Sequence, residues 1–337
     1  MAKVKGIRIS AWRPLALGLT ALAVIAVALS LALAWHHFNA YALTPAPLAG
    51  VFACFVLLLV LALAPGFPSI REPLSRWLPS IPALGIILIW CAPYLIYAAG
   101  TRDFRWSAVL RLMVFAAPLL AVYRWLPVRA PSSFRWQDAV TAILLIAYVL
   151  GRELKGVWNV PANLDFMTRL FVIVVSAWCL LFVRGLPGFR YDFVISGKTL
   201  PTAGLNFLYF AAIALPAGFA LHFIRWNPRW KGPADFAFAY LEIFLFIALL
   251  EEMFFRGFLQ NLISNSLRSS IRGQLIVSCL FGLFHILHAP FPNWRYVALA
   301  AVAGWFYGSA YRSGGILSSA LTHATVDTLW RTFFSAS

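Results

Sequence analysis

Charged residues, and acidic ones above all, are scarce in this chain. Of its 337 residues 11% are charged, only 11 are Asp or Glu, and 62% are hydrophobic, whereas a soluble domain carries roughly 25% charged and 45–50% apolar residues. This composition excludes a water-soluble fold, because one domain could not bury so much apolar surface. Helices and closed barrels can span hydrocarbon. The apolar runs here are continuous and do not alternate with a period of two, which favours helices.

Cysteine is also rare, and its spacing excludes two further classes of protein. Each of the four cysteines lies alone inside an apolar run, at Cys54, Cys91, Cys179 and Cys279. Without a CxxC pair or a mixed Cys/His motif, neither a disulfide framework nor a thiolate zinc site is supported. We expect all four to be small buried apolar side chains.

Positive charge is plentiful by comparison, with 27 Lys and Arg and a net charge of +16. Most of the basic residues lie in short connections between apolar runs, as Arg71 and Arg76 do. That placement is typical of topology signals and of contacts with anionic lipids. We therefore expect the lipid bilayer as a partner, and no nucleic acid.

The apolar runs predict an all-α, polytopic transmembrane helix bundle of about eleven spans, within a range of about nine to twelve. The first run is long enough to span the bilayer, so we favour an uncleaved helix over a signal peptide. The predicted spans lie near residues 15–34, 47–64, 81–99, 107–122, 138–151, 167–184, 203–222, 235–262, 273–288, 296–311 and 315–334.

The basic loops predict a cytoplasmic N-terminus. This orientation places loops 65–80, 123–137, 185–202, 263–272 and 312–314 inside, and all of them carry Arg or Lys. The loop with Arg225, Arg229 and Lys231 is the exception, because it falls outside.

A few charged residues lie inside the predicted spans, where a charge costs about 2.5–3.5 kcal/mol and marks function. Most acidic residues, Asp138 among them, lie near the ends of runs, where water or headgroups can solvate them. Those inside are Glu242, Glu251, Glu252 and Asp327. The C-terminal histidines His285, His288 and His323 fall in the same region, and His288 lies nearest a Pro break and so nearer the interface.

The first polar motif is Glu251-Glu252-Met-Phe-Phe-Arg256. Adjacent residues point about 100° apart on a helix, so the two glutamates cannot serve the same contact. Arg256 is four residues after Glu252 and can pair with it, while Glu251 faces another direction. A structural clamp beside a catalytic base fits this pattern better than an interfacial charge cluster, because apolar residues continue past Arg256.

Two further motifs follow, Phe281-xxx-His285 and His323-xxx-Asp327. A lone His on an apolar helix is more often a satisfied core residue than a ligand, and the His/Asp pair alone is only suggestive. Their depths agree, however. At 1.5 Å per residue, Glu251, His285 and His323 lie ~16, ~18 and ~12 Å from the cytoplasmic ends of their helices. Side chains at one level can enclose a single hydrated cavity.

EExxxR, FxxxH and HxxxD, in this order, resemble the three motifs of the CPBP family, which includes type II CAAX prenyl endopeptidases and bacterial Abi intramembrane proteases. The resemblance covers roughly residues 235–334. It implies a division into N-terminal helices of unassigned role, residues 1–202, and a catalytic helix bundle, residues 203–337.

The resemblance implies a role for each motif residue. Glu251 with His285 would activate the attacking water, and His323 with Asp327 would stabilise the oxyanion. Arg256 would hold Glu252 and the local helix. The prenyl endopeptidases typically have Asn where this chain has Asp327, and an ionised carboxylate cannot donate a hydrogen bond. Asp327 would then be protonated or would orient His323.

No cofactor is favoured, since the family resembles a metal-independent glutamate peptidase. A zinc site of Glu251, His285 and His323 is the alternative, because His₂Glu sets bind catalytic zinc. The chain lacks HExxH, and these ligands would come from three helices.

The expected function is therefore an intramembrane endopeptidase that hydrolyses a peptide bond of a membrane-associated peptide or protein near the membrane surface. We expect it in a bacterial inner or plasma membrane. The alternatives are a non-proteolytic scaffold or immunity member of the same fold and a proton-coupled transporter. Buried Glu, His and Arg also build proton relays, but the chain has no detectable inverted repeat.

Overall fold

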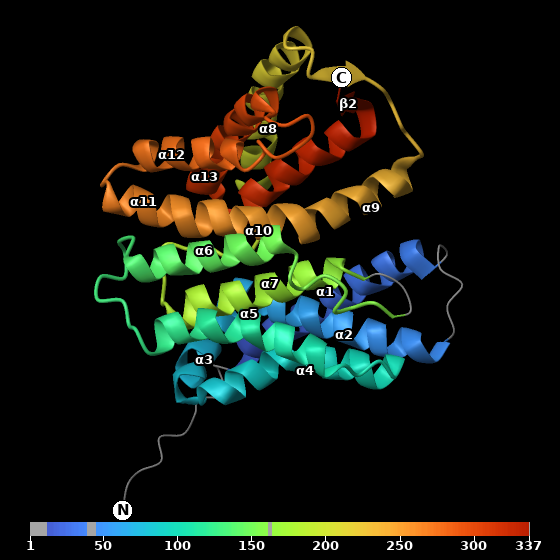
Figure 1. Cartoon of the computed structure of the whole chain (residues 1–337), viewed down its shortest axis with the longest axis vertical. Helices are drawn as coiled ribbons and strands as arrows, with labels where there is room; N and C mark the ends of the chain where they lie inside the picture. Colours follow the sequence, from blue (N-terminus) through green and yellow to red (C-terminus); the bar gives the residue numbers. More distant parts are fainter. Residues whose placement is uncertain (1–11, 39–44, 161–163, 337) are drawn as a thin grey trace, which may run out of the picture. The chain divides into compact units, whose positions relative to one another are not determined.

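The computed structural model describes residues 12–38, 45–160 and 164–336, and these are almost entirely helical (Figure 1). The first helices are α1 (Trp12–Phe38), α2 (Pro45–Leu63), η2 (Ala64–Gly66), α3 (Pro68–Trp77), η3 (Leu78–Ser80), α4 (Ala83–Thr101), α5 (Trp106–Arg124), α6 (Trp136–Gly151), α7 (Phe166–Trp178) and η4 (Cys179–Val183). They are followed by α8 (Thr199–Ala220), β1 (Ile224–Trp226), α9 (Pro233–Ile243), η5 (Phe244–Ala248), α10 (Leu249–Glu252), η6 (Met253–Gln260), α11 (Asn261–Ser266), α12 (Ser270–Leu283), α13 (Trp294–Phe333) and β2 (Phe334–Ala336).

Long apolar helices confirm the prediction of an all-α membrane protein. Within the described ranges seven helices are long and apolar enough to cross a bilayer, and α6 and α12 are shorter apolar helices. The long ones lie at Pro14–Ala32, Pro47–Gly66, Ala83–Thr101, Trp106–Arg124, Phe166–Val183, Thr199–Ala220 and Pro233–Ser266. The predicted number of spans stays a prediction.

The chain divides into two compact units. The first comprises residues 1–120 and 153–178, and the second comprises residues 121–152 and 179–337. The predicted boundary at residue 202, between helices of unassigned role and a catalytic bundle, stays a prediction. All the motif residues belong to the second unit.

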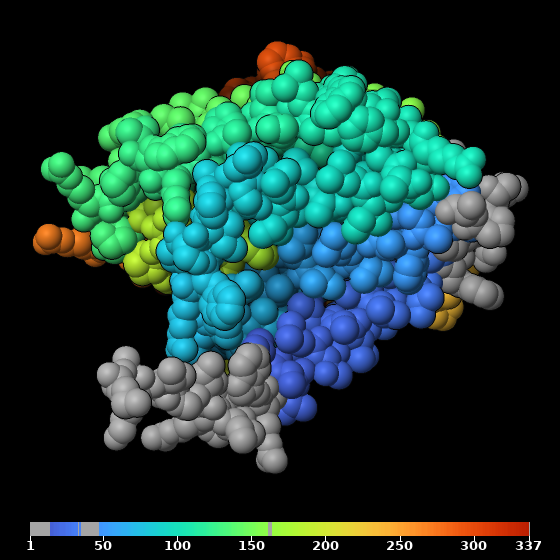
Figure 2. Space-filling model, turned by 90° about the horizontal axis from the view of Figure 1, so that it is seen from below, coloured from blue at the N-terminus to red at the C-terminus, as the bar shows by residue number. Residues whose placement is uncertain are grey.

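In the first unit α2 packs against α4 where two glycines meet. A Cβ on Gly50 would lie 2.5 Å from Gly100 Cα, so the backbones approach as closely as the small residues of membrane helix pairs allow. Farther along α4, Tyr94 and Tyr97 pack edge-on against Trp158 at 5.6 and 5.4 Å. Figure 2 shows the blue and cyan helices of this unit packed side by side on one face.

In the second unit α13 reverses direction at Gly315. This residue has φ 76° and ψ −169°, a conformation that favours glycine. The ring of Tyr307, before the reversal, stacks on His323, after it, with centroids 4.5 Å apart. The two parts of α13 therefore run antiparallel, in agreement with the predicted separate spans 296–311 and 315–334.

Arg190 satisfies the carbonyl groups that the reversal leaves without helical partners. Its Nη1 donates to Tyr311 O at 2.8 Å and to Arg312 O at 2.7 Å, and its own carbonyl accepts from Ile316 N at 3.2 Å. These bonds give the end of the first part of α13 the hydrogen-bond partners that an uninterrupted helix would supply, so the side chain of Arg190 stabilises the reversal.

A buried ion pair lies on the same unit, and it corrects one prediction. Asp138 is not solvated at a helix end. It is fully buried, accepts from Arg184 Nε at 2.9 Å and from Tyr123 Oη at 3.0 Å, and also accepts from the backbone N–H of Arg135 at the start of α6. The pattern of apolar runs could not predict this contact, because Arg184 is 46 residues away from Asp138 in the sequence.

The four cysteines are free thiols, as their spacing predicted. Cys54, Cys91 and Cys179 are buried, but the prediction was wrong for Cys279, which is exposed on α12. An exposed apolar side chain on a membrane helix contacts lipid as readily as protein, so sequence hydrophobicity does not distinguish the two environments.

The Gly50–Gly100 contact generates a stability prediction. Gly50→Ala places a methyl group against the backbone of α4 and should lower the free energy of unfolding by about 1–3 kcal/mol through overpacking. Gly204→Ala, at a position of α8 with no atom within 4 Å of the added Cβ, is the matched control and should be neutral or slightly stabilising. Thermal unfolding in detergent measures both, and equal effects would contradict the close contact.

Candidate active site

The two glutamates lie where the helical run 233–266 departs from α-helical geometry. The N–H of Leu249 bonds to Phe244 O, and that of Asn261 bonds to Arg256 O. These five-residue bonds define π-helical turns on both sides of α10, which the apolar pattern did not predict. Such turns are frequent at functional sites, and they change the directions in which successive side chains point.

Glu252 is fully buried and contacts three side chains. Its Oε1 accepts from His323 Nδ1 at 2.8 Å, and its Oε2 lies 3.0 Å from Arg256 Nε. The hydroxyl of Ser319 also donates to Oε2, and it lies 2.8 Å from Tyr307 O. The predicted Glu252–Arg256 pair is present, and the same carboxylate also orients an imidazole on α13.

Arg256 lies in an aromatic enclosure. Its guanidinium carbon is 4.8 Å from the centroid of Phe281, and it is 5.7 and 5.8 Å from those of Phe255 and Tyr307. Desolvated cation–π contacts of this kind are worth about 2 kcal/mol. The charge of Arg256 is therefore stabilised by a carboxylate on one side and by ring faces around it.

His323 faces carboxylates through both of its ring nitrogens. Nδ1 meets Glu252, and Nε2 lies 3.3 Å from Asp327 Oδ2 and 4.0 Å from Glu251 Oε2. The ring is nearly fully buried, whereas the side chains of Glu251 and Asp327 are 34% and 38% exposed. The cluster thus has a buried inner part and an accessible outer part.

The two glutamates do meet the same ring, contrary to the expectation that they could not serve one contact. Their side chains diverge, as predicted, but an imidazole has nitrogens on two edges. Glu252 reaches Nδ1 and Glu251 lies near Nε2. A helical wheel describes directions around one helix, and it could not show that a ring from α13 lies between them.

His285 lies two residues beyond the end of α12 at Leu283, and not within a helix that continues to residue 288 as predicted. Its ring Nδ1 lies 2.8 Å from Phe281 O, while its backbone N–H bonds to Gly282 O. The ring thus takes the carbonyl that a continuing helix would use for the amide. Because a carbonyl only accepts, Nδ1 carries the proton, and Nε2 is the acceptor nitrogen of the neutral ring.

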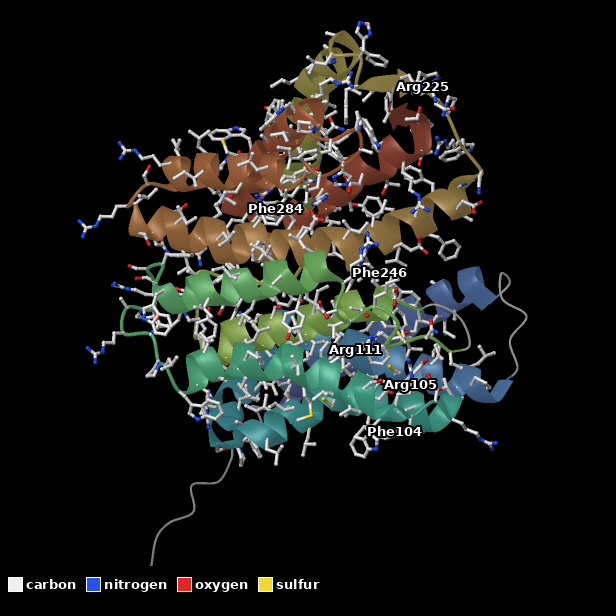
Figure 3. The ribbon with its side chains drawn as sticks, in the orientation of Figure 1. Phe104, Arg105, Arg111, Arg225, Phe246 and Phe284 are labelled. Atoms are coloured by element: carbon white, nitrogen blue, oxygen red, sulfur yellow. The ribbon has the colours of Figure 1, made fainter. Side chains whose placement is uncertain are left out.

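Phe281 connects His285 to the rest of the cluster. Its ring centroid is 5.0 Å from that of His285 and 5.8 Å from that of His323, and His285 lies within electrostatic range of His323 and Asp327. Phe284, labelled in Figure 3, packs against Phe255 at 5.3 Å and ties the end of α12 to η6. The exposed His288 stacks on His285 at the outer side.

Three contacting residues had no signal in the sequence. Ser319 is one of several small residues in an apolar run, and Tyr307 and Tyr296 are ordinary helix aromatics there. In the structure Ser319 bonds to Glu252, Tyr307 stacks on His323, and Tyr296 packs against His285 at 4.6 Å. Their part in the site depends on the reversal at Gly315 and on the pairing of α12 with α13.

A zinc site built on Glu251, His285 and His323 is the alternative that the sequence leaves open, and it stays a prediction. Among residues 12–38, 45–160 and 164–336, no three His, Cys, Asp or Glu side chains form a group that could hold a metal ion. In the contacts described, His323 directs its nitrogens to carboxylates, and the Nδ1 of His285 is used by a backbone carbonyl.

Comparison with known protein families identifies the region that carries the cluster. Residues 233–329 match the family model described as type II CAAX prenyl endopeptidase, Rce1-like. This confirms, for that region, the resemblance found in the three motifs. Comparisons with curated proteins and with solved structures found no match.

The exposure difference between the two glutamates generates a prediction. Glu252→Gln removes the charge that pairs with Arg256 and leaves a buried guanidinium without its carboxylate, so it should destabilise the protein by about 3–5 kcal/mol. Glu251→Gln, on the adjacent and partly exposed side chain, is the matched control and should change stability by less than about 1 kcal/mol. Thermal unfolding in detergent compares them, and an equal loss in both would contradict the assigned geometry.

Proposed function

We propose, from the Rce1-like CPBP family to which residues 233–329 belong, that this chain is an intramembrane endopeptidase whose site is the Glu251–His285–His323–Asp327 cluster. The observation that carries the proposal is the difference in solvent exposure between the Glu252–Arg256 pair and the two carboxylates of this cluster. Glu252 and Arg256 are buried and mutually paired, while Glu251 and Asp327 remain about one-third exposed beside the same imidazole.

Glu251 is proposed as the general base. A catalytic base must be reachable by water and substrate, and Glu251 is the motif glutamate that meets this condition. It would take one proton from a water molecule whose oxygen attacks the carbonyl carbon of the peptide bond. The acceptor Nε2 of His285 would help to hold that water, since the proton on Nδ1 is fixed by the carbonyl of Phe281.

His323 is proposed to stabilise the oxyanion that the attack creates. The His323 ring faces Glu252 at Nδ1 and Asp327 at Nε2, and both carboxylates accept hydrogen bonds, so the ring would donate from both nitrogens. Its Nε2–H is then the donor nearest the exposed carboxylates of Glu251 and Asp327. Asp327 would orient this ring and would not itself bind the oxyanion. Collapse of the intermediate breaks the C–N bond, and the proton held by Glu251 passes to the leaving nitrogen. The products are a carboxylic acid and an amine.

Glu252 is proposed as a positioning residue and not as the base. Its two oxygens are already engaged by His323, Arg256 and Ser319, and it is fully buried. Arg256 holds Glu252 in place, and Phe281 in turn holds Arg256, because the guanidinium lies over the Phe281 ring. We propose no metal in this mechanism.

The substrate is proposed to be a membrane-associated peptide or protein, prenylated or not, cut near the bilayer surface. The protein would lie in a bacterial inner or plasma membrane with its N-terminus in the cytoplasm. The family match and the long apolar helices support the membrane setting, and the basic loops support the orientation.

Cleavage of a membrane-peptide library by the reconstituted protein tests the proposal. Glu251→Ala and His285→Ala should each lower the turnover by about 10²–10⁴-fold, as expected when a general base or its partner is removed. Mass spectrometry of the products measures the rate and locates the cut.

Glu242→Gln is the matched control, because Glu242 lies on the same helical run and its carboxylate is 3.9 Å from Arg331, outside the cluster. It should keep most of the activity. If wild type and both cluster variants give the same products at the same rate, the chain is not a peptidase of this mechanism. If wild type gives no product from the library, the non-proteolytic scaffold is the better description.

Metal dependence has a separate test. A chelator added to an active preparation should leave the rate unchanged within about twofold, since the proposed mechanism uses carboxylate and imidazole groups alone. The measurement is the cleavage rate before chelation, after it, and after addition of Zn²⁺. Loss of activity that zinc restores would replace this mechanism with a metallopeptidase one.

A further inference from the structure

The segment between α8 and α9 is held against both ends of α13. Arg295 Nη1 donates to Leu221 O at 3.3 Å and to His222 O at 3.0 Å, and Phe223 packs on Tyr296 with centroids 5.3 Å apart. At the other end of α13, β1 pairs with β2 in antiparallel register. Figure 3 shows Arg225 at this edge, on the strand next to β2.

The same region presents tryptophans whose positions are fixed. Phe333 lies between Trp226 and Trp230, with centroid distances of 5.6 and 6.1 Å and interplanar angles of 6° and 12°. The two indoles are nevertheless 61% and 51% exposed, and Trp294, beside Arg295, is 58% exposed. Stacked yet exposed indoles are typical of the membrane–water interface, where an amphipathic ring sits among headgroups.

Three basic side chains accompany the tryptophans. Arg225, Arg229 and Lys231 are all exposed, and within the described part of the chain none of them pairs with a carboxylate. Segment 221–232 contains no Asp or Glu. We call the surface formed by Arg225, Trp226, Arg229, Trp230, Lys231 and Trp294 the collar.

The collar lies a short way above the proposed catalytic cluster. His323 precedes Phe333 by ten residues on α13, which is ~15 Å along the helix, and Phe333 stacks on the collar residues Trp226 and Trp230. Tyr296 contacts both Phe223 and His285. Tyr296 therefore connects the segment that carries the collar to the site.

We infer that the collar binds the headgroups of anionic phospholipids and fixes the depth of the cluster at about 15 Å below them. Asp235 follows in the first turn of α9, but it is a single acidic residue against three basic ones, so the net positive charge of the collar complements a phosphate, and the indoles anchor the same level. This assignment also accounts for the one basic loop that opposes the predicted orientation: its charges serve lipid binding and are not a topology signal. The inference concerns the setting of the proposed peptidase site but does not need that site to be active.

Retention of lipid by the full-length protein tests the inference without any cleavage assay. The protein is reconstituted with phosphatidylglycerol or with phosphatidylcholine, extracted, and analysed by native mass spectrometry for bound lipid. Wild type should retain phosphatidylglycerol preferentially. Each lost charge should weaken retention roughly fivefold, so Arg225→Gln/Arg229→Gln/Lys231→Gln should weaken it by well over tenfold, with less effect at high salt.

The matched control is Arg268→Gln/Arg272→Gln/Arg312→Gln. It removes the same charge from exposed residues near the start of α12 and the end of the first part of α13. It should keep most of the preference. Since Arg225 also donates to Ser335 Oγ at 2.8 Å, the double variant Arg229→Gln/Lys231→Gln repeats the test without disturbing that bond, and thermal unfolding checks each fold.

Two results would overturn the inference. One is an equal loss of phosphatidylglycerol in the collar variant and in the control. That result would mean that lipid retention depends on total positive charge and not on the collar. The other is no preference of wild type for phosphatidylglycerol, combined with binding of an acidic peptide in a neutral bilayer, which would make the collar a protein-docking surface. Repeating the assay on Glu251→Gln separates these results from the peptidase proposal, because lipid retention should be unchanged there.

Discussion

The contact between Glu252 and His323 holds the site together. It joins α10, the short α-helical turn of the run 233–266, to the second part of α13, and the two residues are 71 positions apart in the sequence. A buried carboxylate must have its oxygens satisfied, and here an imidazole, a guanidinium and a hydroxyl do so. Without this contact Asp327 and Glu251 would have no common ring beside them.

In the proposed mechanism the cluster separates two tasks that a single carboxylate could not perform. A group that fixes geometry benefits from burial and full pairing, whereas a group that exchanges protons with water must be accessible. Glu252 has the first environment and Glu251 the second, although they are neighbours in the chain. The π-helical turns that flank them separate the two directions while both side chains remain near one imidazole.

The sequence predicted the fold class and the charged and histidine members of the cluster because both are marked by local patterns. Apolar runs identify helices, and charged residues inside them are costly enough to stand out. The Glu252–Arg256 pair also followed from spacing alone. The contact of Glu252 with His323, the burial of Asp138 with Arg184 and the end of α12 before His285 did not follow. The first two depend on a partner that is distant in the sequence. The third depends on whether a side chain or a backbone amide bonds to the Phe281 carbonyl. Hydrophobic periodicity carries no information about either.

The reversal at Gly315 also has an electrostatic consequence. Each part of α13 carries its own macrodipole, with about half a negative charge at a C-terminus and half a positive charge at an N-terminus. Arg190 lies at the negative end of the first part. Ser319, in the first turn of the second part, bonds to Glu252, so the buried carboxylate lies near a positive helix end. An unbroken helix of 40 residues would offer no such end at this depth, and the glycine thereby helps to keep an anion inside the membrane.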